Sequence, residues 1–149
     1  VQSEDFDIGD EIAIISNQNQ NIGGICSFTG LVREFDLNNK IQTMTLEHYP
    51  GMTEKQLDKI EKEANNRWEL SDSLIIHRYG RLKPKDKIVL VVTASAHRKA
   101  AFESCEFLMD WLKTKAPFWK MEETESGSNW VAAKSSDDLE VEKWLTKKK

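Results

Sequence analysis

The stretch KIVLVVT at residues 87–93 contains five consecutive apolar residues, Ile88 through Val92, with no polar side chain between them. A strand with one wet face alternates apolar and polar residues, whereas a strand covered on both faces is apolar throughout. We therefore expect residues 87–93 to form the central strand of a sheet.

Other strands are indicated by period-2 alternation and by β-favouring composition. In residues 40–48 the alternation places Ile41, Thr43 and Thr45 on one face. Further strands are expected at residues 11–15, 22–32, 74–79 and 129–133. Because the strands form a cluster that is interrupted by one helix and followed by another, the pattern favours an α+β fold over strict βαβ alternation. The expected architecture is a mixed, mostly antiparallel sheet with about three helices.

Three helices are expected from capping residues and helical spacing. The first begins at Thr53 as N-cap, with Gln56 reaching back to it and with Met52 and Leu57 as a hydrophobic staple. The second begins near Ser95 and ends before Pro117. Its expected core-facing residues are Ala101, Phe102, Cys105, Leu108, Met109 and Leu112. The third begins within residues 135–138 and runs through Trp144, and residues 147–149 are expected to form a flexible tail.

Length and composition limit the class of protein. The 149 residues suit one domain, and 21 basic against 25 acidic residues give a net charge of −4, which argues against a broadly basic nucleic-acid binder. No apolar run approaches the roughly 18 residues that span a bilayer, and residues 1–10 do not resemble a signal peptide, so we expect a cytoplasmic protein without a membrane partner. Cys26 and Cys105 lack metal-ligand spacing, so we expect no metal and interpret both as buried small apolar residues.

Basic residues gather where the central strand is expected to pass into the second helix, in the sequence SAHRK at residues 95–99. Cations in the first turn of a helix are disfavoured by the helix dipole, and a bound phosphate or sulfate would compensate for His97 and Arg98 there. The alternative is that His97 caps or packs locally while Arg98 and Lys99 extend into water. The usual signatures of hydrolases, nucleotide-binding proteins and zinc proteases are missing.

A second basic cluster lies in LKTKAPFWK at residues 112–120. Lys113 suits the C-terminal end of a helix without further explanation. Lys120 follows the apolar group Pro117, Phe118 and Trp119, and a lysine held against such a wall can have a lowered pKa, which is one route to a catalytic amine. Taken alone, Arg33 is interpreted as a surface arginine, and His48 and His77 as structural histidines.

Seven stretches, in order along the chain, together resemble the large, catalytic subunit of molybdopterin synthase, the MoaE family. They are FTGLVR (28–33), EHYPGMT (47–53), RW (67–68), IIHRYG (75–80), SAHR (95–98), LKTKAPFWK (112–120) and WV (130–131). The resemblance implies an α/β-hammerhead fold and an enzyme of molybdenum-cofactor biosynthesis. Such an enzyme converts cyclic pyranopterin monophosphate, or precursor Z, into molybdopterin by inserting two sulfurs as a dithiolene.

The resemblance also implies the partners. Sulfur arrives as a thiocarboxylate on the C-terminal Gly-Gly of a ubiquitin-like small subunit, and two large subunits form the central dimer of a heterotetramer. Neither a metal nor a cofactor is expected for this sulfur transfer. The rival hypothesis is a non-catalytic module that binds a ubiquitin-like protein or a phosphorylated small molecule.

Site residues follow from the resemblance by position. The two catalytic lysines fall on Lys113 and Lys120, and Glu122 is a candidate for tuning the charge of Lys120. Substrate-phosphate binding falls on Arg33, His97, Arg98 and Lys134. The candidate walls of a channel for the partner's tail are Phe28, Met109 and Phe118, for which core packing is an equal alternative.

Helix length adds an expectation that is independent of the family. If His97 and Lys113 belong to one helix, their 16-residue separation spans about 24 Å, too far for one small pterin to touch both. We therefore expect His97 and Arg98 to act together with the lysines of a second copy of the chain. The family commonly has arginine at the positions where this chain has Leu31 and Lys134. At position 134, lysine keeps the positive charge but cannot form the two parallel hydrogen bonds of a guanidinium, so a phosphate contact there would be looser.

Overall fold

The computed structural model describes residues 1–36, 39–125, 127–131, 142 and 144–145. The helices and strands in these ranges form the α+β mixture that the sequence predicts, with antiparallel sheets. Their order is α1 (Ile8–Gln18), β1 (Gly24–Leu31), β2 (Phe35–Asp36), β3 (Asn39–His48), α2 (Met52–Arg67), β4 (Asp72–His77), β5 (Gly80–Leu82), β6 (Lys87–Ser95), α3 (Arg98–Thr114), β7 (Phe118–Thr124) and β8 (Gly127–Val131).

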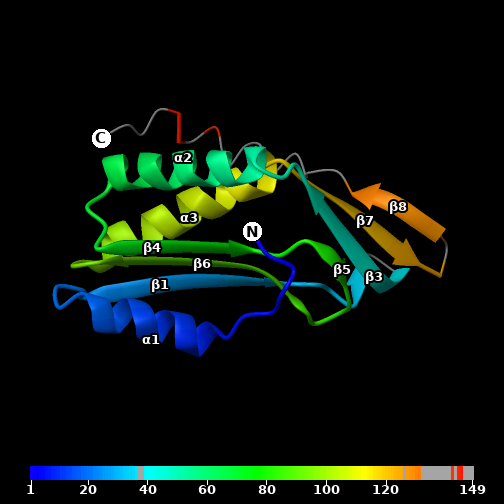
Figure 1. Ribbon diagram of the computed structural model, residues 1–149, viewed down its shortest axis with the longest axis horizontal. Helices are drawn as coiled ribbons and strands as arrows, with labels where there is room; N and C mark the ends of the chain where they lie inside the picture. Colours follow the sequence, from blue (N-terminus) through cyan, green and yellow to red (C-terminus); the bar gives the residue numbers. More distant parts are fainter. Residues whose placement is uncertain (37–38, 126, 132–141, 143, 146–149) are drawn as a thin grey trace.

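A first sheet has the order β1-β6-β4, with both outer strands antiparallel to β6. Helices α2 and α3 cover one face of this sheet and α1 covers the other (Figure 1). Val91 packs in the core beneath α2 and α3, while Leu90 and Val92 pack beneath α1, and all three side chains are fully buried. Burial on both faces explains why the β6 sequence has no polar alternation, and it confirms β6 as the central strand.

A second sheet has the order β2-β3-β7-β8, and β5 also pairs with β3. It lies beyond the end of the first sheet at which β4 ends (Figure 1). Its core is formed by Val32, Ile41, Met44, Leu46 and Leu82. The long strand β3 confirms the period-2 expectation for residues 40–48, whereas β2, β5 and β7 have no counterpart among the expected strands.

The expected strand at residues 11–15 is wrong, because these residues lie within helix α1. The side chain of Asp7 caps this helix by accepting a hydrogen bond from the N–H of Asp10 at 2.9 Å. Ile8, Ile12 and Ile15 follow at helical spacing and pack against the first sheet. This cap and this spacing are the sequence signals that identify the helix.

Helix α2 begins differently from the expectation. Its N-cap is Gly51, whose φ of +85° suits glycine, and the carboxylate of Glu54 accepts a hydrogen bond from the Gly51 N–H at 2.6 Å. Thr53 therefore lies inside the first turn, and Gln56 is not its capping partner. The fully buried Thr53 hydroxyl donates to the carbonyl of Tyr49 at 2.8 Å, which fixes the loop before the helix.

Helix α3 confirms the long second helix but begins at Arg98 rather than near Ser95. Phe102 is 63% exposed, so its expected place in the core is wrong, whereas Ala101, Cys105, Leu108 and Leu112 are buried as expected. Of the helix expected from residues 135–138 through Trp144, only residues 142 and 144 are described, and Trp144 is a buried residue in a turn. The tail at 147–149 falls outside the described residues. In the described part of the chain, each helix is too short or too polar to cross a bilayer.

Candidate functional site

Lys113 and Lys120 lie where α3 passes into β7. Lys113 is exposed in the last turn of α3, and Lys120 is the third residue of β7 and is half-buried. The chain turns between them because the N–H groups of Lys115 and Ala116 both donate to the carbonyl of Trp111, at 2.8 and 3.3 Å. Only residues 115–117 separate the helix from the strand, so both lysines lie at one end of the molecule.

Lys120 belongs to a row of side chains on one face of β7. Alternate residues of a strand share a face, so Lys120 lies between Phe118 and Glu122. Glu122 is only 5% exposed and is opposite the buried Met44 of β3, while Lys120 is opposite the buried Leu46. Glu122 therefore lies on the same face of β7 as Lys120 and two residues from it, in the neighbourhood that the sequence analysis expects for this pair.

His77 lies against this row from the first sheet. Its ring stacks on Phe118 with centroids 3.7 Å apart and 15° between the planes. Burial is the main cause that lowers the pKa of His77 to about 4, and the positive charges of the N-terminus, Lys120 and Lys113 act in the same direction. The imidazole is therefore neutral at pH 7, and both lysines are near enough for their charges to act on it. The sequence indicates a structural histidine here but not its place beside the lysines.

Aromatic side chains border the lysine end on the outside. The ring of His48 lies 4.7 Å from that of the exposed Tyr79, and the ring of the exposed Tyr49 lies 4.7 Å from that of Trp119. Tyr49 and Tyr79 are not among the site residues expected from the sequence. Their only sequence signal is their place in the stretches EHYPGMT and IIHRYG.

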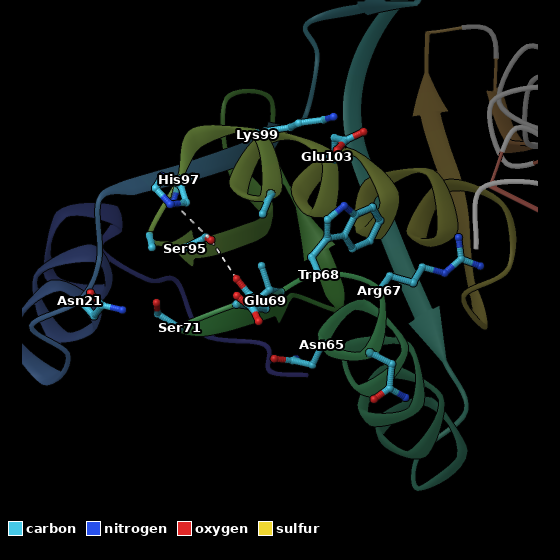
Figure 2. Close-up of a pocket in the computed structure, with 14 residues that line it drawn as sticks. Asn21, Asn65, Arg67, Trp68, Glu69, Ser71, Ser95, His97, Lys99 and Glu103 are labelled. Carbon is cyan, nitrogen blue, oxygen red and sulfur yellow. Dashed lines mark hydrogen bonds between the residues drawn. The ribbon is translucent and has the colours of Figure 1, made fainter. Parts of the chain in front are cut away.

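The second basic group, His97, Arg98 and Lys99, lies at the other end of α3. His97 is the N-cap residue but its side chain makes no capping hydrogen bond, and all three side chains are exposed. The N–H of His97 donates to the Ser95 hydroxyl at 3.5 Å, and this hydroxyl donates to the carbonyl of Glu69 at 2.8 Å (Figure 2). The His97 side chain therefore does not cap the helix, whereas Arg98 and Lys99 extend into water as the alternative to anion binding expects.

Two cavities adjoin this helix start. The larger, about 660 Å³, lies between the end of α2 and the start of α3, and Figure 2 shows the polar side chains around it. The smaller, about 580 Å³, is lined by His97, Arg98, Lys99, Phe102 and Glu103. An uncapped helix N-terminus with three basic side chains suits an anion such as a phosphate.

Arg33 is not brought together with His97 and Arg98 in one copy of the chain. Arg33 follows β1 beyond Leu31, which pairs with Lys87 at the beginning of β6, and it is exposed. The opposite end of β1, Gly24, pairs with Ser95 beside His97. Eight residues of strand, about 26 Å, therefore separate the two positions. Arg33 instead lies at the end of the first sheet where His77 ends β4.

The remaining candidates are spread over several elements. Phe28 is 44% exposed on β1, Met109 is half-buried on α3, and Phe118 is half-buried with one ring face covered by His77. Packing therefore accounts for one face of Phe118. Lys134 lies outside the described residues. In the part of the chain that the structure describes, no three His, Cys, Asp or Glu side chains gather as a metal ion would require.

Comparison with known proteins links this geometry to one family. The family model described as "MoaE protein" matches residues 1–115. A curated relative from Ralstonia nicotianae, "Molybdopterin synthase catalytic subunit", is 50% identical over 144 residues, which cover 97% of this chain and 82% of the relative.

Solved structures share the fold. The "Molybdopterin biosynthesis MoaE protein" from Burkholderia ambifaria superposes with a TM-score of 0.83 at 50% identity, covering 97% of this chain and 95% of the other. A more distant match, with a TM-score of 0.69 at 22% identity over 90% of this chain and 89% of the other, is a chain from the "Protein-protein complex of subunit 1 and 2 of Molybdopterin-converting factor" of Helicobacter pylori.

Proposed function

The chain belongs to the MoaE family, and on that premise we propose that it is the catalytic subunit of a molybdopterin synthase. In the proposed reaction, two sulfur atoms pass to cyclic pyranopterin monophosphate, precursor Z, to form the dithiolene of molybdopterin, one from the C-terminal thiocarboxylate of each of two ubiquitin-like small subunits. Water cleaves each bond between the acyl carbon and sulfur, and each small subunit leaves with an ordinary C-terminal carboxylate. The observation that carries the proposal is that Lys113 at the end of α3 and Lys120 in β7 lie at one end of the molecule, beside the stacked rings of His77 and Phe118. The curated relative of 50% identity bears the name of this enzyme subunit.

The lysine pair suits a sulfur-transfer site that receives an anionic tail. The exposed ammonium of Lys113 is placed to pair with the terminal thiocarboxylate of the partner, because it projects from the helix end into solvent. The half-buried Lys120 is placed to donate a proton or to stabilise negative charge on the pterin as sulfur adds. Glu122, buried on the same face of β7, is the proposed residue that tunes the charge of Lys120.

The phosphate-binding residues require a second copy of the chain. A copy related by a two-fold axis and placed antiparallel along β1 would bring the Arg33 end of each β1 to the His97 end of the other. Among the described residues, β1 pairs only with β6, so its other edge is available. Phe28 and Phe102 are exposed on β1 and on the adjacent α3, as an apolar interface would require. The proposed site thus combines Arg33 and the two lysines of one copy with His97 and Arg98 of the other.

The proposed partner is the ubiquitin-like small subunit, which gives a heterotetramer when one binds at each end of the dimer. The Helicobacter pylori chain of the same fold was solved in a complex of two subunits. A Gly-Gly tail suits a narrow channel because glycine has no side chain to exclude the tail from close approach to the backbone. Phe28, Met109 and Phe118 remain the proposed walls, and Lys134 a further phosphate ligand.

The experiment is a reconstitution of sulfur transfer. The chain, a carrier ending in a Gly-Gly thiocarboxylate and cyclic pyranopterin monophosphate are mixed, and the dithiolene product is followed by mass. We expect product only when all three are present, with the same yield after treatment with a chelator, since the proposed mechanism uses no metal. A carrier ending in an ordinary carboxylate is the matched control.

The contrary outcome is equally specific. If the carrier binds tightly but no product forms, the chain is a non-catalytic binding module, which is the rival hypothesis. If neither carrier nor pterin binds, both hypotheses fail.

A further inference from the structure

A buried aromatic contact joins the two sheets at the lysine end. His77 is the last residue of β4 in the first sheet, and Phe118 is the first residue of β7 in the second. Their rings are stacked, with centroids 3.7 Å apart and 15° between the planes. The contact therefore fixes where β7 begins relative to the first sheet.

The imidazole itself is held in one orientation. His77 is 7% exposed and its backbone pairs with Val89 of β6. Its Nδ1 lies 2.9 Å from the carbonyl oxygen of Arg78. Because a carbonyl oxygen can only accept, Nδ1 carries the hydrogen and donates it. A ring fixed by the backbone of its own sheet provides a rigid surface for Phe118.

Phe118 is linked directly to both lysines. Lys120 follows it by two residues on the same face of β7, about 7 Å along the strand. Lys113 precedes it across the short turn of residues 115–117, and the Phe118 N–H donates to the carbonyl of Ala116 at 2.8 Å within that turn. A shift of the Phe118 ring would therefore move Lys120 relative to the helix that carries Lys113.

We propose that His77 is a positioning residue, which through its stack on Phe118 sets the place of Lys120 relative to Lys113. The inference rests on the proposed sulfur transfer, in which these lysines touch the partner's tail and the pterin. Misplacement of a reacting group by about 1 Å can cost a hundredfold in rate, so a packing contact two residues from a catalytic amine affects turnover.

The charge of His77 is part of this role. Burial is the main cause that lowers the His77 pKa to about 4, the positive charges of the Val1 amino group, Lys120 and Lys113 act in the same direction, and the hydrogen bond to the Arg78 carbonyl opposes them. The ring is therefore neutral at pH 7 and adds no third positive charge beside the lysines. A phenyl ring at position 77 would reproduce both the stacking and the neutrality.

Two substitutions at one position separate positioning from simple packing. In His77→Phe, which keeps a flat neutral ring, kcat should stay within about threefold of the wild type. In His77→Leu, which has no ring, kcat should fall about tenfold to a hundredfold. In both variants the KM for the pterin and the Kd for the partner should change less than about twofold. If His77→Leu does not fold, His77→Gln replaces it, because glutamine keeps a donor for the Arg78 carbonyl but cannot stack.

Controls distinguish this effect from lost stability. Ile76→Ala removes buried volume from the neighbouring residue, which packs in the core beneath α1, and it should lower Tm without changing kcat at a temperature where the chain is folded. The double variant His77→Leu with Phe118→Leu should lose no more kcat than the worse of the two single variants, because both act through one contact. The proposal is overturned if His77→Leu and His77→Phe have the same kcat. It is also overturned if Ile76→Ala loses as much kcat as His77→Leu.

A measurement without turnover keeps this test separate from the proposed function. The side-chain NMR signals of ¹³C-labelled lysine are assigned with Lys113→Arg and Lys120→Arg. His77→Leu should shift and broaden the Lys120 signal, and His77→Phe should leave it in place. If the wild type makes no dithiolene, the proposed function fails while this result still decides whether His77 positions Lys120. An unchanged Lys120 signal in His77→Leu overturns the inference.

Discussion

His97 and Lys113 occupy opposite ends of one helix. His97 is the N-cap of α3 and Lys113 lies in its last turn, so 16 residues of helix hold them about 24 Å apart. The antiparallel strand β1 beside this helix spans a similar length and carries Arg33 beyond its far end. Because the two groups lie far apart in one chain, the proposed site must combine side chains from two copies, and this requirement can be tested by mixing variants.

Mixing two inactive variants should restore activity. His97→Ala removes a phosphate-binding side chain from each copy, and Lys120→Ala removes the catalytic amine from each copy. Each variant alone should therefore be inactive. A mixed dimer would contain one site with both defects and one intact site. After subunit exchange at equal amounts, about a quarter of all sites should be intact. Activity measured in the mixture should therefore recover to about 25% of wild type, and no recovery would place the residues of one site within one chain.

Alanine substitutions of the two lysines should affect different steps, turnover for Lys120 and carrier binding for Lys113. Lys120→Ala should lower kcat by about a hundredfold or more while the partner still binds, because a proton donor is lost. Lys113→Ala should weaken binding of the thiocarboxylated carrier by about tenfold, because one charge-assisted hydrogen bond is lost. Kinetic assays and carrier titration measure the two effects. Lys115→Ala, an exposed lysine just after α3, is the matched control and should resemble the wild type.

The close approach of the backbone at Gly23 to Ala96 should affect how the start of α3 binds the substrate phosphate. A Cβ at Gly23 would overlap the carbonyl oxygen of Ala96, next to His97, whereas a Cβ at Gly24 would lie 3.7 Å from its nearest neighbour. Gly23→Ala must therefore displace the chain before α3, and it should raise the KM for the pterin several-fold with an unchanged Kd for the carrier. Gly24→Ala is the control. Equal KM values for the two variants would show that the placement of His97 does not matter for substrate binding.

Stability should depend on the titration of His77. Its pKa is about 4 in the folded chain against an ordinary value of 6.5, so the unfolded state binds the proton first as pH falls. The contribution of neutral His77 to the free energy of unfolding is complete above about pH 6.5 and is lost as the pH decreases to about 4. The full loss corresponds to about 3 kcal/mol of unfolding free energy.

Denaturant unfolding of the wild type and His77→Phe at several pH values isolates this effect. The phenylalanine variant cannot titrate at position 77, so its stability relative to the wild type should rise by about 3 kcal/mol between pH 7 and pH 4. His97→Ala, which removes a surface histidine, is the control. A difference between wild type and His77→Phe that does not change with pH would contradict burial of a neutral imidazole.

Local patterns in the sequence determined the main elements of the fold. The apolar run from Ile88 to Val92 predicts the central strand because a strand covered on both faces needs no polar residues. Helical spacing predicts α3, and alternation predicts β3. Local signals conflict at residues 11–15, where the apolar residues suit a strand but the Asp7 cap starts helix α1.

The sequence alone could not place residues that meet only through tertiary contacts. The motifs identified Lys113, Lys120, His97 and Arg98 as candidates, and helix length separated the two pairs. Only the fold showed that the His77 ring packs on Phe118 beside both lysines and that Arg33 lies at the lysine end. The physical reason is that strand pairing and sheet packing join residues distant in sequence, and no local periodicity records which strand ends will meet.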